Sequence, residues 1–266
     1  QSYLLGPTEA AEKVFKGAHC ASNAPVKKYE ISAINVEITL NAWGDYYPGY
    51  TYVLKEDIAK IRAEEKKNEA AREEENDPGA VSQGLQGDAI QPLVLRANQG
   101  DCVRVHLSNQ VEDEDVGFQV NGSAMIISSS GLPDTAASKG AIIPAGESQD
   151  FEWMIPIDEQ EGSHLIQSRS GRDPSALGLI GAFIVEPVGS TYLDPWDAKP
   201  LKNGWEAIIA NDEDRDFREF VLFYHEVGDE SFRPLNRFGE MIPQRDPLTD
   251  AYRPSARAMN YRSEPF

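Results

Sequence analysis

The feature that most constrains the fold of this chain is a series of short, β-rich segments between residues 91 and 186. Gly, Pro, Asn or Ser separates each segment from the next. The segments are Gln91–Ala97, Cys102–Leu107, Gly117–Val120, Phe151–Ile155, Gly162–Ser168 and Ile180–Glu186. Strands of this length, with turn residues between them, are typical of an all-β sandwich or barrel. Residues 28–40 predict a further strand, because from Ile34 onward apolar and polar residues alternate as in a strand with one buried face.

A charged segment, Leu54–Asn76, interrupts the β-rich pattern. It is packed with Glu, Lys, Arg and Ala, and its apolar residues Leu54, Ile58 and Ile61 have the i, i+4, i+7 spacing of one helix face. Beyond Ile61 the apolar stripe ends, and Pro78-Gly79 closes the segment. We expect residues 54–78 to form a charged helical insertion on the surface, and a partner-binding helix is the alternative.

The two ends of the chain differ from its centre. Residues 1–27 are predicted to be a leader, mostly loop, with a short helix near Glu9–Phe15. Near the other end the pattern predicts one more strand, Phe217–Val227. The final stretch, Phe232–Phe266, is rich in Pro and Arg, so we expect it to be extended and to lie across another domain. We interpret the chain as part of a longer protein.

Composition excludes some classes of function. The formal net charge of −19 would repel phosphate backbones, so nucleic acid is not an expected partner. The sequence contains no apolar run of about 18 residues, so no membrane-spanning segment is expected. It also lacks a phosphate-cradling glycine loop, a nucleophile elbow and a zinc motif.

Cys20 and Cys102 are the two cysteines of the chain. We expect them to form a disulfide, because the chain has the character of an exported protein and no cysteine metal motif. Such a bond would close a loop of about 80 residues, worth on the order of 4 kcal/mol by the chain-entropy estimate. Two buried free thiols are the alternative.

Three segments carry a more specific pattern. The first, Pro92–Asn109, is a strand, a Gly-Asp turn and a second strand ending in Asn. The second is Gly117–Ser123, and the third runs from Gly162 to Pro187 and ends in Gly-Leu-Ile-Gly-Ala-Phe-Ile-Val-Glu-Pro. In this order and spacing they resemble the first cupredoxin domain of a multicopper oxidase. The closing residues 257–266 resemble a junction in large bacterial members similar to ceruloplasmin and to manganese oxidases.

The resemblance covers roughly residues 28–40 and 85–266, and it implies a domain organisation. Residues 28–188 would form a cupredoxin-like Greek-key β-sandwich that contains the helical insertion. Residues 189–266 would form a linker, the first strand of a second cupredoxin-like domain and an extended C-terminal segment.

The copper-ligand positions that the resemblance implies hold other residues here. In the family, the second and third segments each carry His-x-His; the matching positions are Gln119 and Asn121, then Gln167 and Arg169. Amide oxygens are weak donors for copper, and a permanent cation repels a metal ion. We therefore expect no copper in this chain. Either these four side chains form a hydrogen-bonded amide–guanidinium network, or they are solvated remnants.

The histidines offer no substitute site, because no two of them stand in a His-x-His or His-x-x-x-His relation. Cys102 precedes His106 by four residues, which on one strand places them about 13 Å apart, too far for one metal. We therefore expect no blue-copper site, and we interpret His164 and His225 as structural residues.

These observations favour a non-catalytic scaffold region of an extracytoplasmic (periplasmic or secreted), multicopper-oxidase-like protein. Its partners would be further cupredoxin domains of the same or another chain. One alternative is the N-terminal part of an active multicopper oxidase whose other domains hold copper and couple oxidation of metal ions or organic molecules to reduction of O2. The other is a self-assembling extracellular structural protein, which would be a homo-oligomer.

Overall fold

The computed structural model describes residues 20–73, 88–112, 114–121, 128–129, 132–133, 142–168, 170, 173–213, 215–228, 232–246, 248–252 and 256–262. Its strands are β1 (Val26–Thr39), β2 (Tyr46–Leu54), β3 (Leu93–Asn98), β4 (Cys102–Gln110), β5 (Val116–Gly117), β6 (Gln119–Val120), β7 (Ser128–Ser129), β8 (Leu132–Pro133), β9 (Ile142–Ile143), β10 (Ser148–Met154), β11 (Gly162–Gln167), β12 (Ile180–Glu186), β13 (Thr191–Leu193), β14 (Glu206–Ala210), β15 (Phe217–Phe220), β16 (Tyr224–Val227) and β17 (Ala256–Met259). Its helices are a 3-10 turn (Lys55–Asp57), α2 (Ile58–Glu73) and the short α3 (Asp173–Ala176).

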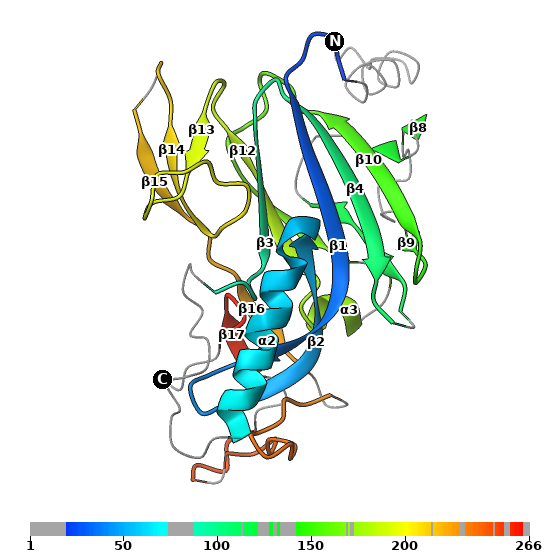
Figure 1. Ribbon diagram of the computed structural model, residues 1–266, viewed down its shortest axis with the longest axis vertical. Helices are drawn as coiled ribbons and strands as arrows, with labels where there is room; N and C mark the ends of the chain where they lie inside the picture. Colours follow the sequence, from blue (N-terminus) through cyan, green and yellow to red (C-terminus); the bar gives the residue numbers. More distant parts are fainter. Residues whose placement is uncertain are drawn as a thin grey trace, which may run out of the picture.

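Two sheets form the sandwich (Figure 1). One has the strand order β2-β1-β4-β10-β7-β8 and the other β3-β12-β11-β6. Each sheet contains one parallel pair, β1 with β4 and β3 with β12, because the chain visits the other sheet between the two strands of each pair. The predicted all-β, cupredoxin-like sandwich with a helical insertion is confirmed.

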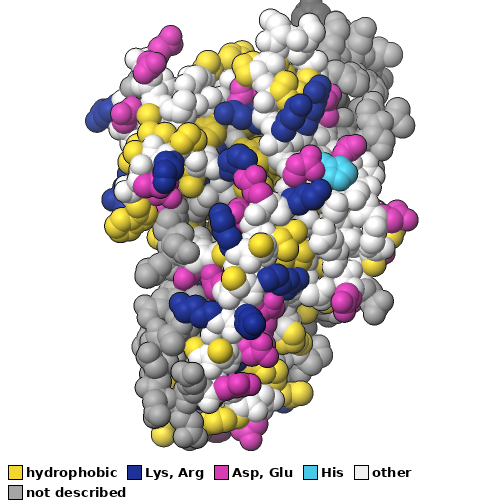
Figure 2. Space-filling model, viewed as in Figure 1, with side chains coloured by type: hydrophobic (Ala, Val, Ile, Leu, Met, Phe, Trp, Pro, Cys, Tyr) yellow, Lys and Arg dark blue, Asp and Glu magenta, His cyan; other side chains and the backbone are white. Residues whose placement is uncertain are grey.

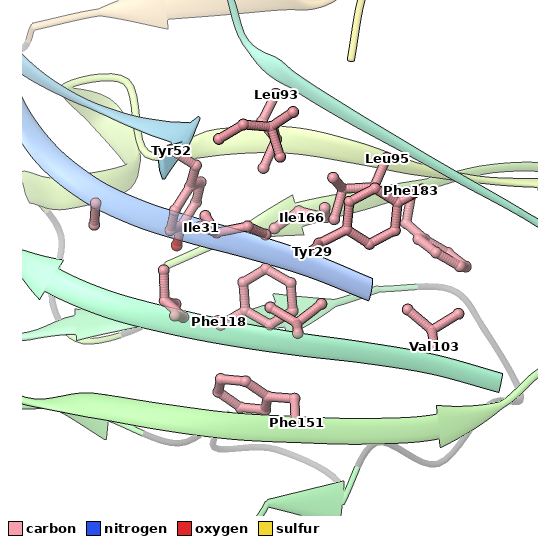
Figure 3. Packing of buried hydrophobic residues seen from close by; sticks show 14 of the residues in the cluster. Tyr29, Ile31, Tyr52, Leu93, Leu95, Val103, Phe118, Phe151, Ile166 and Phe183 are labelled. Atoms are coloured by element: carbon pink, nitrogen blue, oxygen red, sulfur yellow. The ribbon is translucent and has the colours of Figure 1, made fainter. Parts of the chain in front are cut away.

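Side chains from both sheets meet in the main core (Figure 3). Tyr29 and Ile31 come from β1, Leu95 from β3, Phe151 from β10 and Phe183 from β12, and each is less than a tenth exposed. Strands alternate their side chains between two faces, so the alternating apolar residues noted in the sequence supply this layer.

A second core lies on the other side of the four-stranded sheet. Strand β1 changes its buried face at Ala33 and Ile34, which are both fully buried, and from Ile34 onward it contributes to this second cluster. The cluster also takes up side chains from β12 and from the C-terminal part of the chain: Ile180, Ala182, Ile184, Val221, Phe223, Val227, Ala258 and Tyr261. Ala258 and Tyr261, from the segment expected to lie across another domain, therefore pack on this chain's own sandwich.

Helix α2 is fixed to the sandwich along its length (Figure 1). Its buried residues are Ile61, Asn68, Ala71 and Arg72. The N–H of Glu37 on β1 donates to Glu65 at 2.7 Å, and Arg72 pairs with Glu37 and lies 4.1 Å from the ring centroid of Tyr46. Burial beyond Ile61 departs from the expected fully charged surface, because polar contacts replace the apolar stripe there.

A small sheet of order β13-β14-β15 and a two-stranded sheet of β16 with β17 follow the sandwich. The strand predicted over Phe217–Val227 is in fact two shorter strands that pair with different partners. The ladder is interrupted between them because the Asn260 side chain accepts the Phe223 N–H at 2.9 Å. Asn260 thus holds the chain where it passes from one sheet to the other.

The predicted disulfide is confirmed: Cys20 and Cys102 are bonded, with 5.4 Å between their Cα atoms. The bond ties the segment before β1 to the start of β4, next to the parallel pairing of Val26 with Cys102. The helix expected near Glu9–Phe15 lies outside the described residues. Among the residues described, no helix is both long enough and apolar enough to cross a membrane.

Candidate functional site

The positions that the resemblance assigns to copper ligands lie on the outer face of the four-stranded sheet. Strands β6 and β11 are antiparallel, and their register places Gln119 directly opposite Gln167. The Asn121 N–H donates to the carbonyl of Leu165 at 2.8 Å, which continues this ladder by two residues. Since residues opposite each other share a face, Gln119, Asn121 and Gln167 lie together. Arg169 lies outside the described residues.

The described part of the chain covers the two halves of this outer face unequally. Ile180 and Ala182 on β12 face the second core, where Phe223 and Tyr261 cover them. On β11, by contrast, Leu165 pairs with Ala182 yet remains 43% exposed. The half of the face that carries Gln119, Asn121 and Gln167 is therefore less covered than the half on β12: these three side chains are partly buried, and Leu165 between them is exposed.

The donor set here does not fit copper. A copper ion that cycles between Cu(I) and Cu(II) requires strong neutral nitrogen donors, and the three described positions offer amides. The Gln119 Oε1 atom is buried without a hydrogen-bond partner among the described residues, and no hydrogen bond joins it to Asn121 or Gln167. The amide–guanidinium network remains a prediction, because it requires Arg169.

The three described histidines lie in different parts of the molecule. His164 and Leu165 are neighbours on β11, and neighbouring side chains of a strand point to opposite faces. His164 therefore points to the opposite side of the sheet from Gln119 and Gln167. His106 lies on the six-stranded sheet, where its Nδ1 is 2.6 Å from Asp150. His225 is on β16, and its Nε2 accepts the Tyr261 N–H at 3.3 Å. These three cannot share a metal ion, and His19 lies outside the described residues.

One group of possible metal ligands occurs among the described residues: Cys20, Cys102 and Glu152, whose ligand atoms lie within 4.8 Å of one another. The disulfide consumes both thiols, and a thiolate is the form of cysteine that binds metals. Glu152 in turn pairs with Arg104 at 2.6 Å. The group is therefore structural while the disulfide is intact.

A buried ionic cluster joins the sandwich to the small sheet, and sequence reasoning missed it. Arg96 on β3 is 1% exposed and donates to Glu219 on β15 at 2.6 and 2.9 Å. It also donates to the carbonyl of Gly204 at 2.9 Å and lies 3.6 Å from Glu186 on β12. Desolvation, and then the neighbouring Glu219, raise the pKa of Glu186 to about 8, although Arg96 acts in the opposite direction. An arginine inside an otherwise apolar strand was the signal in the sequence.

No protein-family model matches this chain, and no curated protein matches its sequence. In fold the chain is similar to a multicopper oxidase from Pseudomonas thermotolerans, at 16% identity and a TM-score of 0.45, over 91% of this chain and 43% of that one. A copper nitrite reductase from Nitrosomonas europaea shares 16% identity at a TM-score of 0.43, over 85% of this chain and 60% of that one. A laccase from Botrytis aclada shares 12% identity at a TM-score of 0.37, over 65% of this chain and 24% of that one. The chain thus spans less than half the length of the first of these proteins, and at these identities the likeness concerns the fold alone.

Proposed function

We propose that this chain is a non-catalytic scaffold region of an extracytoplasmic, multicopper-oxidase-like protein. The observation that carries the proposal is the chemistry of one sheet face: Gln119 and Gln167 stand opposite each other where the family resemblance implies imidazoles. Amides at these positions keep the shape of the sheet but remove the strong donors that copper requires.

The partner of this scaffold is a further cupredoxin-type domain, on the same or another chain. Support comes from the outer face of the four-stranded sheet, where the apolar Leu165 is 43% exposed beside amide groups. Amides can donate and accept hydrogen bonds across an interface, and an apolar side chain among them gains from burial there. The disulfide between Cys20 and Cys102 supports a location in an oxidising compartment.

Copper content measured by inductively coupled plasma mass spectrometry tests the proposal. The purified chain is incubated with Cu(II), passed through a desalting column and analysed for copper per chain. We expect well below one copper per chain, because amide oxygens do not retain the ion. Stoichiometric copper that survives desalting would contradict the proposal and favour a working copper site.

A variant with restored imidazoles provides the control. Gln119→His combined with Gln167→His places two imidazoles opposite each other on adjacent strands, where side chains are about 5 Å apart at Cβ. This variant should retain more Cu(II) than the parent chain. If it does, the low copper content of the parent reflects its donor set rather than a blocked surface.

A further inference from the structure

Strand β15 is an open edge of the small sheet (Figure 1). It pairs with β14 on one side, and within the described part of the chain no strand pairs with its other side. An edge strand presents unpaired N–H and C=O groups, which makes it a template for another strand. Only four residues, Phe217–Phe220, form this edge, so any partner must match a short pattern.

The hydrogen-bond phase of β15 identifies which residues face outward. The Val221 N–H donates to the Trp205 carbonyl at 2.7 Å, so this is a hydrogen-bonded pair of the antiparallel ladder. Such pairs alternate along a strand, and Glu219 with Ala207 is the next one. The backbone N–H and C=O groups of Arg218 and Phe220 therefore point away from β14 towards the open edge.

The side chains beside this edge are unusually apolar for a surface. Phe220, Leu222 and Tyr224 alternate along the extended chain and are 53%, 49% and 78% exposed, while the intervening Val221 and Phe223 are buried. Met259, which is 40% exposed, lies opposite Tyr224 where β16 pairs with β17, and it adds a further exposed apolar side chain. Hydrophobic side chains also appear at the surface of the small sheet in Figure 2. Exposed apolar side chains that recur at alternate positions beside an open edge are a feature of interaction sites.

We propose that β15 pairs with β15 of a second copy of this chain, antiparallel about a two-fold axis through Glu219. In such a pair, the backbone N–H and C=O groups that point to the open edge of one copy bond to those of the other copy. Arg218 of each copy therefore stands opposite Phe220 of the other. The contact is isologous: the same patch is used twice, and the assembly closes as a dimer.

The side chains of the short strand complement themselves in this register. Within one chain the Arg218 guanidinium already lies 5.1 Å from the Phe220 ring centroid, and across the dimer each guanidinium meets the ring of the other copy. The register also brings the two Glu219 residues together at the axis. Arg96 binds each of these carboxylates from within its own chain, which removes most of their repulsion.

The proposal goes beyond the scaffold function and does not depend on it, because a chain that bound copper could still dimerise through β15. Sedimentation equilibrium of the whole chain at increasing concentration measures the association. We expect a monomer–dimer equilibrium that strengthens with NaCl, because each copy carries a net charge of −19 and salt screens the repulsion between copies.

Two edge variants test the site. Phe220→Pro removes an outward N–H while leaving the ladder to β14 and the ion pair of Arg218 with Glu206 intact, and Phe220→Lys places a charge on the seam. Each should weaken dimerisation by about tenfold or more, since losing 1.4 kcal/mol of contact changes an equilibrium tenfold. Phe238→Lys is the matched control: it changes an aromatic residue that is 74% exposed elsewhere, and it should leave dimerisation unchanged.

Disulfide trapping tests the register even if the edge variants fold poorly. A mixture of Arg218→Cys chains with Phe220→Cys chains should give a crosslinked dimer on mild oxidation, whereas either variant alone should not. Cys20 and Cys102 are already bonded and do not interfere. A chain that stays monomeric at every concentration, or a dimer indifferent to both edge variants, would overturn the proposal.

Discussion

Glu186 should make the stability of this protein fall as pH rises through neutrality. Its carboxyl group is 2% exposed, and its pKa is raised from 4.5 to about 8, chiefly by desolvation and then by Glu219. In the unfolded chain the same group loses its proton near its ordinary pKa. Between these two values the folded state binds one proton more, so the free energy of unfolding decreases as pH increases.

The slope for one proton is about 1.4 kcal/mol per pH unit. His225 acts in the opposite direction below its ordinary value: its folded pKa is lowered from 6.5 to about 4 by desolvation, so it adds stability as pH rises towards 6.5. Above about pH 6.5, His225 therefore contributes little to the change of unfolding free energy with pH. From about pH 6.5 to about pH 8 we expect a loss of about 2 kcal/mol attributable to Glu186.

The variant Glu186→Gln isolates this contribution, because an amide can still donate to Glu219 but does not titrate. Urea unfolding at both ends of the window measures it. The parent chain should lose about 2 kcal/mol more than the variant across the window. Glu152→Gln, which changes a surface carboxylate paired with Arg104, should keep the parental slope. Equal slopes in the parent and in Glu186→Gln would refute the reasoning.

Three further predictions concern other parts of the molecule. His225→Gln should reduce the loss of stability that the parent shows as pH falls from about 6.5 to about 4, a loss on the order of 1 kcal/mol per pH unit, measured by acid-side urea titrations. Reducing the bond between Cys20 and Cys102, whose sequence separation is 82, should cost on the order of 4 kcal/mol in unfolding free energy, and an unchanged midpoint with reductant would contradict this. Gly178→Ala should lower the melting temperature, because this glycine has φ +115° and an added Cβ would collide with the Tyr50 carbonyl. Gly146→Ala is the control: this glycine also has a positive φ (+80°), but an added Cβ would meet nothing within 4 Å. A smaller effect of Gly146→Ala would separate the conformational cost from the collision.

The sandwich could be predicted because local patterns specify it. Alternation fixes which face of each strand is buried, and Gly, Pro and Asn fix where strands end. The two glycines of the Gly-Leu-Ile-Gly run have a physical reason: a Cβ at Gly181 would lie 2.6 Å from the carbonyl of Leu93, and Gly178 is equally crowded. The small sheet was missed in part because β13 has only three residues, too few for a periodic signal.

The contacts that fix the helix and the C-terminal segment could not be predicted from the sequence. Arg262 donates to the Thr39 carbonyl across 223 residues, and Arg72 pairs with Glu37 across 35 residues. Buried arginines have no periodic signature, since their burial depends on a partner brought in by the fold. The same limit applies to the site. The family resemblance placed Gln119 and Gln167 at ligand positions, but their direct opposition required the register of β6 with β11.

The change of buried face in β1 has a consequence for what counts as a module in this protein. One strand supplies side chains to both cores, and the second core is completed by Val221, Phe223 and Tyr261, far beyond residue 188. A piece ending at residue 188 would therefore keep the sandwich but leave Ile34, Val36 and the outer side of β12 without their covering. Such a piece would be prone to aggregate. Recombination at that boundary would separate halves that depend on each other, so the smallest unit that can be moved intact between proteins extends through Arg262.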